Sequence, residues 1–183
     1  MKKLLVGAFV GAIVLFAWQS LSWTVFHIHA EAYKYTPAED SLLSAIKGNL
    51  KEEGQYMVPI TPPGSSHEEM EKKGQAMNGK PWAIITYHSA YKFDMVMPLV
   101  RGFLIALLCV IFVCLIIQKQ QRKTKLSVLG TSLAFGIVCF LFVWYNQHNW
   151  FQTSWSILKG ELIDDVASWG LCGIWLGVWY TRK

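Results

Sequence analysis

One apolar stretch in the middle of the chain sets the class of this protein: residues 95–117 read MVMPLVRGFLIALLCVIFVCLII. A helix needs about 20 mostly apolar residues to cross about 30 Å of hydrocarbon. Three further stretches approach that length and composition, at residues 4–26, 126–145 and 162–180. The sequence therefore predicts an all-α membrane protein with four transmembrane helices.

The basic residues that flank these stretches are segregated from the acidic ones. Three short segments carry only positive charge: Lys2, Lys3, Lys119, Arg122, Lys123, Lys125, Arg182 and Lys183. All 12 Asp and Glu residues lie toward the other side, the last two at the start of the fourth stretch. Because cytoplasmic flanks of membrane helices are enriched in Lys and Arg, we expect both termini and residues 118–125 in the cytoplasm. Residues 27–93 and 146–161 are then exported.

The net charge of +5 comes with these helix flanks, so it gives no reason to expect a nucleic-acid partner. The N-terminal segment resembles a signal peptide, with Lys2-Lys3, an apolar run and Ala30-x-Ala32. That run exceeds the roughly 7–15 residues of a signal sequence, which favours an uncleaved anchor. All four cysteines (Cys109, Cys114, Cys139 and Cys172) fall inside predicted spans, where we expect apolar packing rather than disulfides.

The exported segment between the first two spans, residues 27–93, predicts a small α+β module. Thr36 and Glu39 are placed to cap a short amphipathic helix that ends before Gly54. Residues 55–60 and 82–89 are rich in strand formers and predict a hairpin.

The connection between the two predicted strands, residues 61–80, combines Pro, Gly, Ser and charged residues with little apolar content. This composition predicts a mobile loop. One helix and two strands are marginal alone, so we expect the module to rest on the membrane surface or on the second exported segment.

Two glycine pairs at helical spacing predict close helix packing, Gly7-x-x-x-Gly11 in the first span and Gly173-x-x-x-Gly177 in the fourth. Arg101 lies roughly 10 Å inside the second span, at about 1.5 Å per residue from Asp94. Its charge can reach the interface, form a structural ion pair with Asp164 or Asp165, of which we choose Asp164, or contact a ligand or partner. We expect the ion pair.

A metal site at the exported rim is a weaker hypothesis. His27, His29 and His148 lie just outside predicted spans, at the level of several carboxylates, and imidazoles with carboxylates are ligands for Zn²⁺. No histidine lies mid-span to ligate haem, and no metalloprotease, phosphate-binding or nucleophile motif occurs. We therefore expect no cofactor, and enzymatic activity stays open.

One further pattern points to a family. Phe16-x-Trp18-x-x-x-Ser22-Trp23, followed by Gly54-x-Tyr56-x-x-Pro59, resembles a family of small bacterial four-helix inner-membrane proteins of uncharacterised activity. The resemblance covers about a third of the chain and implies a multi-pass location in a bacterial inner membrane. It transfers no functional residues.

Two functions follow as hypotheses. The first is an accessory or interaction subunit of a larger membrane complex, whose exported module contacts other membrane proteins. The alternative is a small membrane enzyme or metal-dependent protein that works at the exported rim through His27, His29, His148, Arg101 and Asp164. Convergence of those five side chains distinguishes the two.

Overall fold

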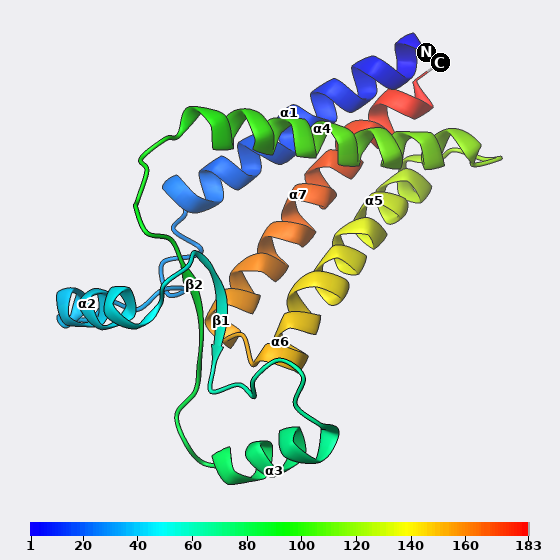
Figure 1. Ribbon diagram of the computed structural model, residues 1–183. Coiled ribbons are helices and arrows are strands. Elements are labelled where there is room, and N and C mark those ends of the chain that lie inside the picture. The colour runs from blue at the N-terminus through cyan, green and yellow to red at the C-terminus, as the bar shows by residue number, and fades with distance from the viewer. Residues whose placement is uncertain (183) are drawn as a thin grey trace. The chain divides into compact units, whose positions relative to one another are not determined.

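The computed structural model describes residues 1–182 and divides into two compact units (Figure 1). The helical unit comprises Met1–Lys34 and Asp94–Lys183, and the α+β unit comprises Tyr35–Phe93. The helical unit holds α1 (Lys2–Thr24), α4 (Val96–Lys119), α5 (Lys125–Cys139), a π-helical segment (Phe140–Tyr145), α6 (Asn146–Phe151) and α7 (Trp155–Thr181). The α+β unit holds α2 (Glu39–Asn49), β1 (Gly54–Val58), α3 (His67–Met77) and β2 (Ala83–Tyr87).

Three helices are long and apolar enough to cross a membrane: Lys2–Thr24, Val96–Lys119 and the continuous rod Lys125–Phe151. The prediction of a membrane protein is confirmed at this level. Helix α7 is also long, but Lys159, Glu161 and two aspartates interrupt its first half and lower its mean hydropathy. The fourth predicted span stays a prediction.

The core of the helical unit lies where α7 packs against α1 and α5, and where α1 packs against α4. Fully buried side chains from four helices meet there, among them Val110, Ile117, Val128, Cys172 and Leu176. Large apolar side chains such as Ile105 and Phe112 point outward on α4 and are more than half exposed. An apolar outer surface around a packed core suits a lipid environment.

The two glycine pairs take part in the close packing that their spacing predicts. A Cβ on Gly7 would lie 2.9 Å from Trp179 Cδ1 of α7, and one on Gly11 would lie 2.8 Å from Val110 Cγ1 of α4. On α7, Gly173 and Gly177 approach the backbone of α5 in the same way. Helix α7 therefore contacts α5 through its own glycines and α1 through the glycines of α1.

The connection between the third and fourth apolar stretches is shorter than predicted. The third apolar helix continues through the π-helical segment to Phe151, and α7 begins at Trp155. Only three residues connect the two helices, with Gln152 in the left-handed region at φ 52°. Residues 146–161, predicted as a single connection between the third and fourth spans, instead form α6 and the first turns of α7.

The α+β unit contains the predicted hairpin, with β1 and β2 antiparallel and Gly54 opposite Tyr87. The predicted amphipathic helix is present as α2, but it begins at Glu39 and has no side-chain cap. Thr36 Oγ1 instead accepts from the N–H of Ala38 at 3.3 Å. The predicted start of this helix is thus wrong, because the hydroxyl closes a local turn.

Residues 61–80 contain helix α3, where the sequence analysis predicts a loop. Ser66 caps the helix by accepting from the N–H of Glu69 at 3.3 Å, and Glu69 Oε2 accepts from the N–H of Ser66 at 2.7 Å. This reciprocal capping box satisfies two N-terminal donors. The polar composition that predicts a loop therefore belongs to a capped, solvent-facing helix.

Candidate functional site

A buried polar cluster joins the end of α1 to the first half of α7. We call it the His29 cluster, and its members are Trp18, Trp23, His29, Glu161 and Asp164. His29 Nε2 lies 2.9 Å from Asp164 Oδ2, and Trp18 Nε1 donates to Asp164 Oδ1 at 3.0 Å. Both carboxylate oxygens of Asp164 thus have partners inside the protein, as a buried carboxylate requires.

The chain brings His29 to this position by turning back immediately after α1. The N–H of Ile28 donates to Ser22 O at 3.1 Å, so the backbone folds against the last turn of the helix. His27 adopts the left-handed region at φ 50°, and the N–H of Ala30 donates to its carbonyl at 3.0 Å. This reversal directs His29 toward α7 while His27 stays exposed.

Two neighbours fix the plane of the His29 ring. The indole of Trp23 stacks on it, with centroids 4.1 Å apart and planes 7° apart. On α7, a Cβ added to Gly160 would lie 2.7 Å from His29 Nδ1. The ring therefore occupies a slot that only glycine leaves open at position 160.

The second ring nitrogen faces another carboxylate at longer range. His29 Nδ1 lies 3.9 Å from Glu161 Oε1, beyond hydrogen-bond distance. Glu161 and Asp164 share a face of α7 because they are three residues apart. The imidazole between these two carboxylates joins the segment after α1 to α7.

The other predicted site residues do not join this cluster. His148 Nδ1 lies 2.7 Å from Thr153 O, and its ring packs against Tyr145 and Trp155. Within residues 1–182, no group of three or more His, Cys, Asp or Glu side chains is arranged to hold a metal ion. Only two of the five residues that the enzyme hypothesis requires, His29 and Asp164, come together.

The expected ion pair between Arg101 and Asp164 is absent. Arg101 is exposed on α4, and no carboxylate of residues 1–182 lies within 4.0 Å of it. Asp164 instead accepts from the ring groups of Trp18 and His29, which come from α1 and the turn after it. An imidazole and an indole satisfy the buried carboxylate, and Arg101 is free to extend along the surface of α4.

Sequence reasoning missed the roles of Trp18, Trp23 and Gly160. Trp18 and Trp23 are typical of the aromatic belt at a membrane interface, and that general property hid their specific contacts. The available signal was the run Gly160-Glu161-x-x-Asp164, which places two acids and a bare backbone on neighbouring positions of one helix.

Comparison of the chain with protein-family models, with curated proteins and with solved structures finds no match. The resemblance to a family of small bacterial inner-membrane proteins stays a prediction.

Proposed function

We propose that this chain is an integral-membrane accessory subunit whose α+β unit contacts a partner protein. In this proposal α1, α4, the Lys125–Phe151 rod and α7 all span a bacterial inner membrane. Both termini lie in the cytoplasm and the α+β unit is exported. The segregation of basic from acidic residues supports that orientation.

One observation carries the proposal: no residue of the α+β unit, Tyr35–Phe93, is buried. Tyr35 is 80% exposed, Leu43 is 63% exposed and Ile60 is 62% exposed. A two-stranded hairpin with two short helices does not bury enough apolar surface to stabilise itself. Large exposed apolar patches mark interaction surfaces, and these side chains are candidates for such a surface.

A protein surface is a better cover for this unit than lipid headgroups. The unit carries six lysines and seven acidic residues, so its net charge is close to zero. Membrane-surface helices bind anionic lipids through an excess of basic residues, and this unit has none. Its apolar side chains need a partner that supplies an apolar face of its own.

Replacement of Tyr35–Phe93 by a Gly/Ser linker tests the proposal. We expect the helical unit to insert and purify normally while a stoichiometric partner protein is lost. A sharper variant, Leu42→Asp with Leu43→Asp, changes only α2 and should also release that partner. A matched control, Glu68→Lys with Glu71→Lys, changes charge on α3 without removing apolar surface. Retention of the partner after the linker replacement would contradict the proposal.

The alternative of an enzyme or metal-dependent protein has less support. His27, His148 and Arg101 make no hydrogen bond or ion pair with the His29 cluster, and among the described residues no group of three or more His, Cys, Asp or Glu side chains is arranged to hold a metal ion. We therefore do not propose it.

A further inference from the structure

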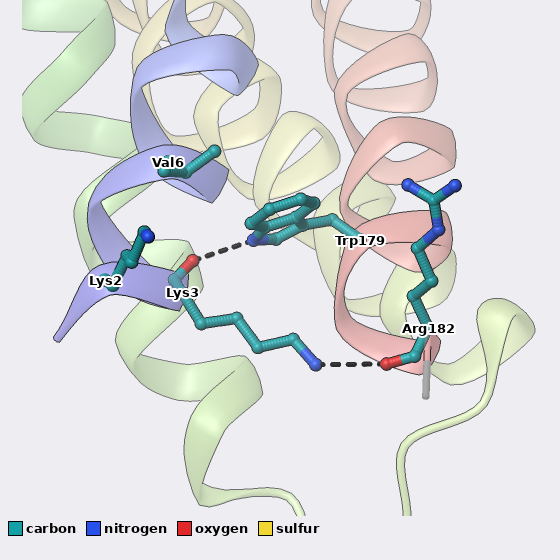
Figure 2. A pocket seen from close by; sticks show the side chains of 5 residues that line it. All are labelled: Lys2, Lys3, Val6, Trp179 and Arg182. Carbon is teal, nitrogen blue, oxygen red and sulfur yellow. Dashed lines mark hydrogen bonds between the residues drawn. The ribbon is translucent and has the colours of Figure 1, made fainter.

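A basic pocket lies between the start of α1 and the end of α7. It has a volume of about 370 Å³ and is lined by Lys2, Lys3, Val6, Trp179 and Arg182 (Figure 2). Three of these five residues are cationic, and none is acidic. The first two turns of α1 and the end of α7 with the residue after it supply all of them, so residues from opposite ends of the sequence form one site.

The apolar wall of the pocket is held rigidly between the two helices. Trp179 Nε1 donates to Lys3 O at 2.8 Å, as Figure 2 shows, and Trp175 Nε1 donates to Gly7 O at 3.1 Å. The two indoles stack with centroids 5.5 Å apart. Because Gly7 has no side chain, the Trp179 ring lies directly against α1. The pocket is therefore preformed.

The cationic groups of the pocket retain free hydrogen-bonding capacity. Lys3 Nζ spans the gap and donates to Arg182 O at 3.2 Å, which uses one of the three ammonium donors. Within the described part of the chain, the side chains of Lys2 and Arg182 form no hydrogen bond or ion pair. Ammonium and guanidinium groups of this kind are the usual donors to phosphate oxygens.

The surroundings of the pocket favour a lipid over a soluble ligand. Helix α1 is long and apolar enough to cross a membrane, so its first turn lies where headgroups meet hydrocarbon. Indole rings favour that depth. Basic pockets between membrane helices on the cytoplasmic side are typical sites for anionic headgroups.

We propose that this pocket binds the phosphate of an anionic phospholipid. Lys2, Lys3 and Arg182 donate to the phosphate oxygens, while Val6 and Trp179 pack against the glycerol and the first methylenes. The proposal requires only that α1 crosses the bilayer. It is independent of any protein partner of the α+β unit, so the two proposals fail separately.

Lipid retention on the full-length protein tests this site. The protein is reconstituted in nanodiscs with equal amounts of phosphatidylglycerol and phosphatidylcholine, extracted in mild detergent and analysed by native mass spectrometry. The wild type should retain phosphatidylglycerol preferentially. Lys3→Gln with Arg182→Gln should lower that retention about thirtyfold, since the variant removes two charges and each charge near a membrane contributes about 1 kcal/mol. Retention of phosphatidylcholine should not change.

Two further variants separate the pocket from general surface charge. Arg122→Gln with Lys123→Gln removes the same charge from the turn between α4 and α5, and should leave retention unchanged. Val6→Trp keeps every charge but fills the pocket, and should lower retention. Equal loss in the turn variant, or full retention in both pocket variants, would overturn the proposal.

Inorganic phosphate distinguishes a lipid from a soluble ligand. In lipid-free detergent, we expect millimolar phosphate to leave the melting temperature unchanged and not to displace bound phosphatidylglycerol. A stabilisation by phosphate that Lys3→Gln with Arg182→Gln abolishes would overturn the lipid as the ligand and assign the pocket to a soluble phosphate compound.

Discussion

His29 Nε2 lies 2.9 Å from Asp164 Oδ2, and this buried contact joins residues 135 positions apart in the chain. Trp18, Trp23 and Gly160 surround the pair and leave the imidazole one orientation. The contact fastens the segment after α1 to α7, and three of the predictions below depend on it.

Removal of either partner of this pair should destabilise the helical unit. We expect His29→Ala and Asp164→Ala each to lower the unfolding free energy in detergent by about 1–3 kcal/mol, because each leaves a buried polar group unpaired. The double variant should cost less than the sum of the two. His67→Ala, at the exposed start of α3, is the control. Strict additivity of the two losses would show that the contact contributes nothing.

Gly160→Ala should be destabilising by about 1–3 kcal/mol, because its methyl group would displace the His29 ring. Gly130→Ala is a matched control in α5, where nothing lies within 4 Å of the added carbon. There alanine should be neutral or stabilising by about 0.5–1 kcal/mol, since it favours helix over glycine. Melting temperatures in the same detergent compare the two, and equal effects would count against the slot.

Arg101→Leu should leave stability within about 0.5 kcal/mol of the wild type, because an exposed side chain without a partner contributes little. The same measurement on Arg101→Leu combined with Asp164→Ala should show simple additivity. A large loss for Arg101→Leu alone would restore the ion pair that the sequence predicts.

Protection of α3 should depend on pH. The backbone N–H and then the hydroxyl of Ser66 donate to Glu69 and hold the pKa of that carboxyl below its ordinary value. A lowered folded-state pKa means that the stabilisation is present above the ordinary value and is lost as pH falls through the lowered one. Hydrogen exchange of residues 67–77 should therefore quicken in acid relative to neighbouring helices. Glu69→Gln, which cannot titrate, should lack this step.

The proposed orientation is testable by labelling. Ser65→Cys should react with a membrane-impermeant maleimide from the exported side, and Lys123→Cys should react only after the membrane is opened. The wild type controls for its four native cysteines, which lie within the helices of the helical unit. Reaction of Lys123→Cys from the exported side would reverse the topology.

The features that could be predicted are those that depend on short stretches of sequence. The apolar runs predict three helices that are long and apolar enough to cross a membrane, the glycine spacing predicts the close contacts of α7, and the strand formers predict the hairpin. In each case the relevant interaction is with lipid, with the adjacent helix turn or with a neighbouring strand.

The His29 cluster could not be predicted in the same way. Its contacts depend on the reversal after α1 and on the rotation of α7, neither of which has a short sequence signature. Opposite charge and similar depth are the only features that predict a pair between Arg101 and Asp164. The packing of α1 on α7 instead brings Trp18 and His29 within hydrogen-bond distance of the Asp164 carboxylate.

The indole bonds from α7 to α1 also bear on how the protein is made. Translation delivers α1 to the membrane first and α7 last, yet the carbonyls of Lys3 and Gly7 accept from Trp179 and Trp175. These two hydrogen bonds of α1 can therefore form only after α7 has been synthesised. A chain interrupted before Trp175 therefore leaves the carbonyls of Lys3 and Gly7 without these two indole donors.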